Sequence, residues 1–121
     1  MTPLREKQLF LLDMDGTIYL DGTLFSGTPP FLEYVRKSGG RYLFLTNNSS
    51  RSADAYVKKL SAMGVPTERG DFLTSTDALI SDLKKRPPYR LCYAFGTESF
   101  RSQLRQAGIP GTDRLSDEID C

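Results

Sequence analysis

The chain has 121 residues, a length at which a single domain can bury a substantial core. Its 16 Lys and Arg residues nearly balance its 15 Asp and Glu residues, so the net charge of +1 gives no electrostatic indication of nucleic-acid or membrane binding. The sequence contains no His, which excludes Ser-His-Asp hydrolysis, Cys-His proteolysis, phosphohistidine transfer and His-ligated zinc within this chain.

Apolar runs and amphipathic runs alternate through the first half of the chain. Residues 8–12 form a compact apolar run that predicts a buried strand, and residues 29–38 predict a helix with Thr28 as its N-cap. Residues 42–45 predict a second strand. Apolar residues at helical spacing in residues 52–63 predict a second helix.

The same alternation continues in the second half. The predicted elements are a strand at residues 71–73, a helix that runs through Lys85, a strand at residues 91–95 and a helix at residues 98–107. Ser75 or Thr76 offers the cap of the third helix, and Pro87-Pro88 ends it. Strands that alternate with helices predict an α/β fold in which helices pack on a parallel sheet.

A hairpin signal interrupts this alternation between the first strand and the first helix. Asp21-Gly22 separates the apolar triplets at residues 18–20 and 23–25, and an Asp-Gly pair favours a two-residue turn with positive φ at both positions. We therefore predict a small hairpin that projects after the first strand, close to that strand's carboxyl end.

The two Cys residues do not form a disulfide framework. Cys92 lies in an apolar run and is interpreted as a small buried hydrophobe, and Cys121 is the last residue. The apolar run at residues 9–12 is too short for a signal-peptide core or a membrane span. These features predict a soluble, cytoplasmic protein that contacts neither nucleic acid nor membrane.

Polar residues follow the first two predicted strands. Asp13, Asp15 and Gly16 come after the first strand, and Thr46 and Asn47 come after the second. Ligands of parallel α/β sheets bind beyond the carboxyl ends of the strands. Two close carboxylates repel each other, and a bound Mg²⁺, which prefers oxygen ligands, relieves that repulsion. One carboxylate can then attack phosphorus while the other moves a proton.

Each of these patterns also has a purely structural interpretation. Asp and Gly are common turn residues at strand ends, and the Asn-Asn-Ser-Ser run at residues 47–50 can be a turn followed by a helix cap. An EF-hand is excluded, because the residue eleven positions after Asp13 is Leu24 and not the required Glu.

Two motifs decide between these interpretations. Phe-Leu-Leu-Asp-Met-Asp-Gly-Thr at residues 10–17 resembles the first motif of the haloacid dehalogenase-like hydrolases, and Phe-Leu-Thr-Asn-Asn-Ser-Ser at residues 44–50 resembles their second. The doubled Asn and Ser are similar to the branch with 4-nitrophenylphosphatases, pyridoxal phosphate phosphatases and the N-acetylglucosamine-metabolism phosphatase. The predicted hairpin resembles the flap of this family, whose fold is Rossmann-like.

The resemblance implies a role for each matching residue. Asp13 is the expected nucleophile, which forms an aspartyl-phosphate, and Asp15 is the expected general acid and base. The two residues are also the expected Mg²⁺ ligands, through the Asp13 carboxylate and the Asp15 backbone carbonyl. Thr46, assisted by Asn47, is expected to bind the phosphoryl group. The implied partner is a small phosphate monoester, and a homodimer is the oligomeric state considered for the complete protein.

The chain departs from the family pattern after the second motif. The family has a third motif with a Lys and a fourth with acidic metal ligands, both beyond a large cap domain. We therefore expect residues 1–88 to be the N-terminal part of the hydrolase core and residues 89–121 to be the beginning of a cap. Lys58 and Lys59 are expected to face solvent on the second helix.

Three functions are consistent with these observations. The first is Mg²⁺-dependent hydrolysis of a phosphate monoester through an aspartyl-phosphate. The second is a catalytically incomplete fragment, or a protein that binds phosphate or a partner without turnover. The third is a receiver-like phosphoacceptor domain, against which the hairpin and the Thr-Asn-Asn-Ser-Ser run at residues 46–50 count.

Overall fold

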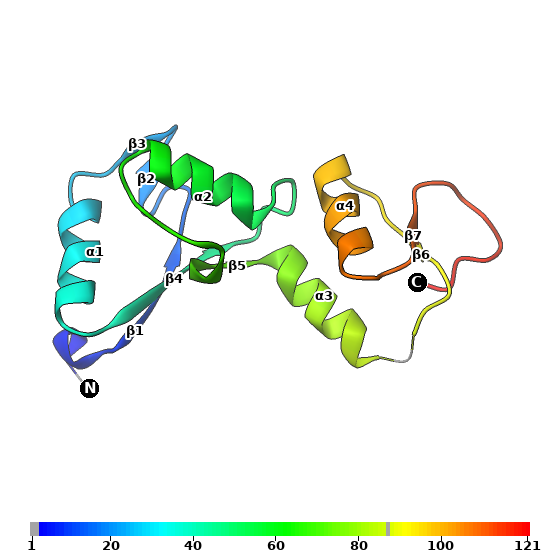
Figure 1. The fold of residues 1–121 in the computed structure, drawn as a ribbon, viewed down its shortest axis with the longest axis horizontal. Coiled ribbons are helices and arrows are strands. Elements are labelled where there is room, and N and C mark those ends of the chain that lie inside the picture. The colour runs from blue at the N-terminus through cyan, green and yellow to red at the C-terminus, as the bar shows by residue number, and fades with distance from the viewer. Residues whose placement is uncertain (1–2, 87) are drawn as a thin grey trace. The chain divides into compact units, whose positions relative to one another are not determined.

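The computed structural model describes residues 3–86 and 88–121 (Figure 1). Pro87, which was predicted to help end the third helix, and the first two residues of the N-terminal segment lie outside the described residues. The chain forms two compact units. The first comprises the described part of Met1–Thr46 together with Ala53–Leu73, and the second comprises Asn47–Ser52 together with the described part of Thr74–Cys121. The predicted division after residue 88 stays a prediction.

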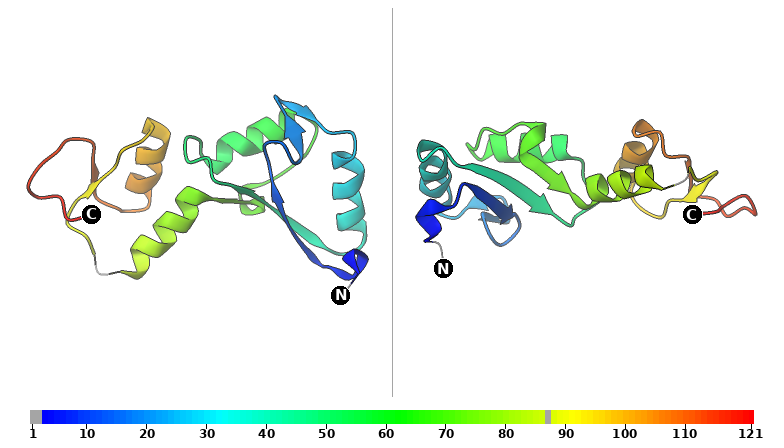
Figure 2. Two further views of the ribbon diagram at one scale, coloured as in Figure 1. Left: turned by 180° about the vertical axis from the view of Figure 1, so that it is seen from behind. Right: turned by 90° about the horizontal axis from the view of Figure 1, so that it is seen from below.

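The first unit is built on a three-stranded sheet. Its strands are β1 (Leu9–Asp13), β4 (Arg41–Thr46) and β5 (Phe72–Thr74), in the order β1-β4-β5. β1 and β4 run parallel and side by side, with Asp13 opposite Leu45 at their carboxyl ends (Figure 2). The predicted parallel α/β arrangement is therefore confirmed for this unit.

Two helices cover one face of this sheet. They are α1 (Thr28–Lys37) and α2 (Ala53–Ala62), and their apolar side chains form one core with those of the strands. The fully or nearly buried members of this core that come from the three strands and two helices are Leu32, Val35, Tyr42, Phe44, Ala53, Tyr56, Leu60 and Phe72. On the opposite face, Leu9 and Leu11 are 55% and 57% exposed.

The predicted hairpin is present after β1. Its strands β2 (Tyr19–Leu20) and β3 (Thr23–Leu24) pair antiparallel, and the turn residues Asp21 and Gly22 have φ values of 48° and 85°. Positive φ at both positions is the requirement that the Asp-Gly pair was expected to meet. We call residues 18–25 the flap.

The start of α1 differs from the prediction. Gly27 is the N-cap, and no side chain caps the helix there. Thr28 is instead buried, and its hydroxyl donates to the Ile18 carbonyl at 2.7 Å. The Thr28 side chain therefore ties the start of the helix to the flap, at a carbonyl that also accepts from the Phe25 N–H at 3.2 Å. This bond satisfies the buried Thr28 hydroxyl, which would be costly to leave unpaired.

The second unit contains two helices and two short strands. These are α3 (Ser75–Lys85), β6 (Cys92–Tyr93), α4 (Glu98–Gln106) and β7 (Gly111–Thr112), with β6 and β7 parallel. β6 is shorter than the predicted strand, and β7 was not predicted. Two 3₁₀ turns, Leu4–Glu6 and Arg69–Asp71, were also not predicted; both fall within the ranges of the first unit.

The predicted caps of α3 are wrong. Thr74 is the N-cap: its hydroxyl accepts from the Asp77 N–H at 3.1 Å, while the Asp77 carboxylate accepts from the Thr74 N–H at 2.9 Å. This reciprocal capping box satisfies donors at both positions. Ser75 and Thr76 are helical residues, one and two positions after the N-cap.

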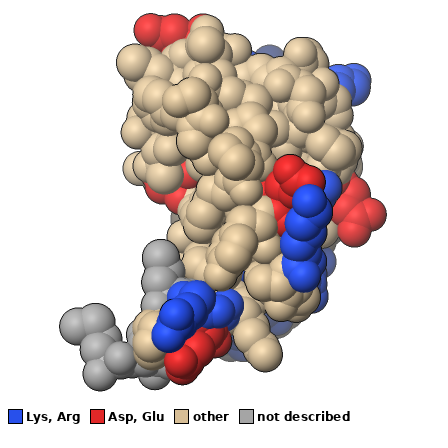
Figure 3. Space-filling view, turned by 90° about the vertical axis from the view of Figure 1, so that its left-hand side faces the viewer, with Lys and Arg blue, Asp and Glu red and all other residues tan. Residues whose placement is uncertain are grey.

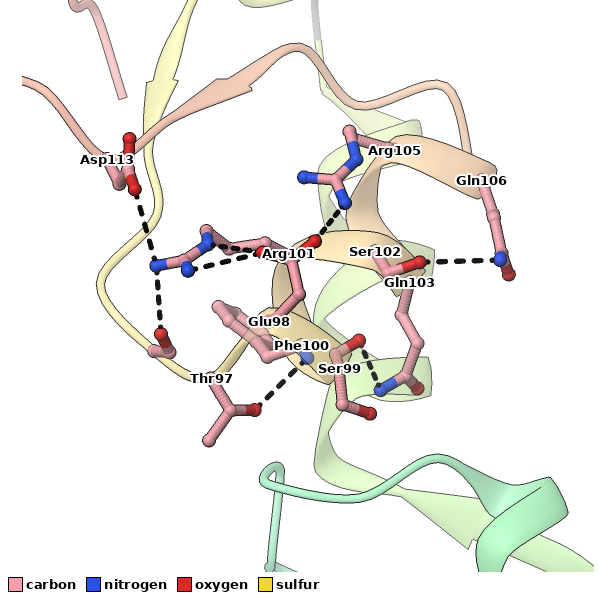
Figure 4. Close-up of polar contacts among 11 residues, drawn as sticks. Thr97, Glu98, Ser99, Phe100, Arg101, Ser102, Gln103, Arg105, Gln106 and Asp113 are labelled. Carbon is pink, nitrogen blue, oxygen red and sulfur yellow. Dashed lines mark hydrogen bonds and ion pairs between the residues drawn. The ribbon is translucent and has the colours of Figure 1, made fainter.

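Charged side chains of α4 form a connected cluster (Figure 4). Glu98 accepts from Arg101 at 3.2 Å and from Arg105, and Arg101 also donates to the Gly96 carbonyl at 3.1 Å. Arg101 lies 3.7 Å from an Asp113 oxygen. The guanidinium group of Arg105, and to a smaller extent that of Arg101, lowers the pKa of the Glu98 carboxyl.

The surface carries both signs of charge. In the space-filling view, acidic and basic side chains lie among a larger neutral area, with red and blue groups next to each other (Figure 3). This face agrees with the near-neutral composition. Among residues 3–86 and 88–121, every helix is too short or too polar to traverse a lipid bilayer.

Candidate active site

Asp13 and Asp15 stand on the solvent side of the chain at the end of β1. Met14 between them is completely buried, whereas both Asp residues are exposed. Side chains of an extended chain alternate between two sides, so one buried residue between two exposed ones places both carboxylates on the same side. This is the arrangement that the two-residue spacing predicted.

A tight turn follows the two carboxylates. Gly16 has a φ of 81°, and its N–H donates to the Tyr19 carbonyl at 2.8 Å. The Thr17 hydroxyl donates to Asp13 Oδ2 at 3.4 Å. The turn therefore bends the chain back into the flap and places a hydroxyl donor beside one carboxylate. Thr17 belongs to the first motif, but no role was predicted for its hydroxyl.

Thr46 lies where the sequence predicted it, at the end of the neighbouring strand. It directly follows Leu45, the residue that pairs with Asp13, so Asp13 and Thr46 come from adjacent strand ends. Thr46 is 7% exposed, which makes it one of few buried polar residues in the described part of the chain. Asn47 is exposed and belongs to the second unit, so its part in this site stays a prediction.

The expectation that both Lys residues of α2 face solvent is wrong for Lys59. Its side chain is 29% exposed, and its Nζ lies 3.8 Å from Asp15 Oδ1 and 3.9 Å from the centre of the Tyr19 ring. Lys58 is exposed, as expected. The helical spacing indicates this position: Lys59 follows the buried Tyr56 by three residues, which places Lys59 beside the packed face of α2.

The donor set at the end of β1 suits a hard cation. Asp13 and Asp15 offer carboxylate and carbonyl oxygens, and Mg²⁺ binds few protein oxygens while keeping waters or phosphate oxygens as its other ligands. Within the described ranges, no three His, Cys, Asp or Glu side chains are grouped as a metal site. The two residues therefore suit a Mg²⁺ ion that keeps waters or phosphate oxygens as its other ligands.

Comparison with known proteins identifies the family to which the two motifs point. The sequence pattern of the haloacid dehalogenase-like hydrolases matches residues 10–110. An acid sugar phosphatase from Staphylococcus aureus (strain USA300) is 26% identical over 106 residues. The crystal structure of a 4-nitrophenylphosphatase from Thermotoga maritima is 36% identical and superposes with a TM-score of 0.85. A glycerol phosphate phosphatase from Mycobacterium tuberculosis, solved in complex with magnesium, is 29% identical with a TM-score of 0.84.

These relatives are longer than the chain. The matches cover 88%, 94% and 97% of this chain, but only 41%, 44% and 35% of the acid sugar phosphatase, the 4-nitrophenylphosphatase and the glycerol phosphate phosphatase. The chain thus spans less than half the length of each. Because the family pattern covers most of the residues, including both strand-end motifs, the chain belongs to the haloacid dehalogenase-like hydrolase family.

Proposed function

We propose that this chain carries the nucleophile and part of the phosphate pocket of a phosphatase that hydrolyses a small phosphate monoester. The observation that carries the proposal is the pair of exposed carboxylates, Asp13 and Asp15, on either side of the buried Met14 at the end of β1. The names of three relatives, all phosphatases, support the same reaction class.

In the proposed reaction, Asp13 acts as the nucleophile and Asp15 moves the proton. A carboxylate oxygen of Asp13 attacks phosphorus, the bond from phosphorus to the leaving oxygen breaks, and Asp15 donates a proton to that oxygen. Asp15, now a carboxylate, takes a proton from water. The resulting hydroxide attacks the phosphorus of the aspartyl-phosphate, which releases phosphate and restores Asp13.

Two hydroxyl groups support these steps. Thr17 donates to Asp13 Oδ2 and so restricts the orientation of the nucleophile. Thr46, at the adjacent strand end, supplies a donor for a phosphoryl oxygen, and Asn47 is proposed to assist with its side-chain amide. Donors that are already in place when negative charge moves onto the phosphoryl oxygens lower the barrier without reorganising.

We further propose that the reaction depends on Mg²⁺. The Asp13 carboxylate and the Asp15 backbone carbonyl would hold the ion, which fits the all-oxygen donor set at the end of β1. When bound, Mg²⁺ supplies positive charge that offsets the charge of the phosphoryl group and of the two carboxylates. One relative, the glycerol phosphate phosphatase, was solved in complex with magnesium.

We also propose a substrate class, a location, an oligomeric state and a domain division for the whole protein. The substrate is a small phosphate ester, and the relatives' names include a sugar phosphatase and a glycerol phosphate phosphatase. A cytoplasmic location and a homodimer are part of the proposal, as is the division into core and cap at residue 88.

Substitution of the nucleophile tests the proposal. The test uses the protein in the form that its source organism produces. In that protein, Asp13→Asn should abolish release of phosphate from 4-nitrophenyl phosphate and should prevent beryllium fluoride from trapping the enzyme. Asp54→Asn is the matched control, because Asp54 is an exposed residue in the first turn of α2. Turnover that persists in Asp13→Asn would show that Asp13 is not the nucleophile.

The second candidate is a chain that binds phosphate or a partner without turnover. It is favoured by the absence, within the described residues, of a third His, Cys, Asp or Glu grouped with Asp13 and Asp15. We expect the 121-residue chain alone to be inactive for this reason. Magnesium-dependent hydrolysis of 4-nitrophenyl phosphate by the purified chain would contradict this candidate.

A further inference from the structure

Lys59 makes two contacts that connect three parts of the first unit. From α2, its ammonium nitrogen lies 3.8 Å from Asp15 Oδ1 and 3.9 Å above the centre of the Tyr19 ring in the flap. The Tyr19 side chain is completely buried, so this ring is a fixed platform. A cation above an aromatic face is attracted by the ring's negative face, and the attraction grows as water is excluded.

The two groups that Lys59 contacts belong to one short loop. Asp15 forms an isolated backbone bridge with Tyr19, and the Gly16 N–H donates to the Tyr19 carbonyl at 2.8 Å. The backbone thus fixes the ends of the loop, but it does not fix the Asp15 side chain, which is 62% exposed. At this exposure water screens the ion pair, and its main effect is to restrict where the carboxylate lies.

We propose that Lys59 is a positioning residue: seated on the Tyr19 ring, its ammonium group contacts Asp15 Oδ1 and so orients the Asp15 carboxyl group, whose other oxygen carries the proton that passes to the leaving group. This inference rests on the proposed function, because it assigns Lys59 to the proton-transfer step of that reaction. Lys58, one residue earlier on α2 and exposed, has no such role.

The dependence of kcat/KM on the basicity of the leaving group reports on this proton transfer. A leaving oxygen of high basicity needs a proton as its bond to phosphorus breaks, whereas the weakly basic 2,4-dinitrophenolate leaves without one. Misplacement of a catalytic group by about 1 Å can cost a factor of about 100. In Lys59→Met, kcat/KM for phenyl phosphate should therefore fall by about 100-fold, whereas that for 2,4-dinitrophenyl phosphate should change by less than about threefold.

Two further variants control the experiment. Lys58→Met removes the same charge from the neighbouring residue and should leave both substrates unaffected. Lys59→Arg keeps a cation above Tyr19 and should recover most of the activity towards phenyl phosphate. Met retains an unbranched side chain with good helix propensity, so α2 should remain folded in both Met variants.

A measurement without turnover accompanies the kinetics. In the 121-residue chain, amide hydrogen exchange at Gly16 should accelerate several-fold in Lys59→Met and stay unchanged in Lys58→Met, because the loop loses its tether to α2. Equal losses on both esters, no loss on either, or unchanged exchange at Gly16 would overturn the inference while leaving the proposed function intact. The kinetic comparison uses the protein purified from its source; if that unsubstituted protein hydrolyses neither ester, the proposed function fails, and the inference fails with it.

Discussion

Substitutions of one buried and one exposed residue of the sheet should differ several-fold in their effect on stability. Phe44 is completely buried in β4, and its ring centre lies 5.2 Å from that of Tyr42 and 5.4 Å from that of Phe72. Truncation of such a ring removes its transfer free energy and leaves a cavity. Phe44→Ala should therefore lower the free energy of unfolding by about 3–5 kcal/mol.

Leu11→Ala is the matched substitution on the opposite face of the sheet. Leu11 is 57% exposed, so about 43% of the surface of this residue is removed from water. Complete burial of a Leu side chain contributes about 1.5–3 kcal/mol, so a side chain with this burial contributes about 0.6–1.3 kcal/mol. The expected loss is therefore about a quarter of that for Phe44→Ala, and no enclosed cavity adds to it.

Urea unfolding of the 121-residue chain, followed by circular dichroism at 222 nm, measures both losses. A small domain has a total stability of about 5–15 kcal/mol, so Phe44→Ala should shift the midpoint strongly or leave the first unit unfolded at low urea. Leu11→Ala should shift it only slightly. If Leu11→Ala costs as much as Phe44→Ala, the assignment of the core to the face covered by α1 and α2 is wrong.

Two further predictions concern the second unit. Cys92 is buried, and burial raises the pKa of its thiol to about 11. In the folded chain, iodoacetamide should therefore label the exposed Cys121 much faster than Cys92. Equal labelling rates of the two Cys residues, measured by mass spectrometry, would contradict this prediction. Hydrogen bonds from the N–H groups of Arg90 and Leu91 lower the pKa of the Asp120 carboxyl. The stabilisation by these bonds should be fully present above 3.8, the ordinary pKa of an Asp carboxyl, and should disappear as the pH falls through the lowered pKa of Asp120 in the folded chain. The amide chemical shifts of Arg90 and Leu91, followed against pH, report this loss.

Features with a local cause could be predicted from the sequence. Asp21-Gly22 favours a turn with positive φ at both positions, and the structure has φ values of 48° and 85° there. Gly64 closes α2 with a φ of 83°, as its place after the last apolar residue of the helix indicates. Both features depend on one or two residues and their immediate neighbours, so no knowledge of tertiary contacts was needed.

Features that depend on a choice between equivalent neighbours could not be predicted in this way. Thr74, Ser75 and Thr76 are three consecutive hydroxyl residues, each of which has the chemistry of an N-cap. Asp77 decides between them, because only Thr74 stands three residues before it and can form the reciprocal pair. Thr28 has the same chemistry, but its hydroxyl donates to Ile18 ten residues away, a partner that only the folded chain supplies.

The candidate site contains both kinds of feature, those with a local cause and those that depend on tertiary contacts. Asp13 and Asp15 follow from motif and spacing, because alternation along an extended chain is a local property. The position of Lys59 depends on how α2 packs against the flap, since its two contacts are 40 and 44 residues away in sequence. The spacing from Tyr56 indicated the correct side of the helix, but not which side chain would be its neighbour.

One register accounts for both the site and the core of the first unit. From residue 9 to residue 15, the odd-numbered residues are exposed, and the even-numbered ones are buried or partly buried. Phe10 and Leu12 pack against the core and Met14 is buried in it, which is why Asp13 and Asp15 both reach solvent. Because a strand has a period of two, a slip by one residue would bury both carboxylates and expose the apolar set. The free energy gained by burying the three apolar side chains therefore also holds the nucleophile and its partner at the surface.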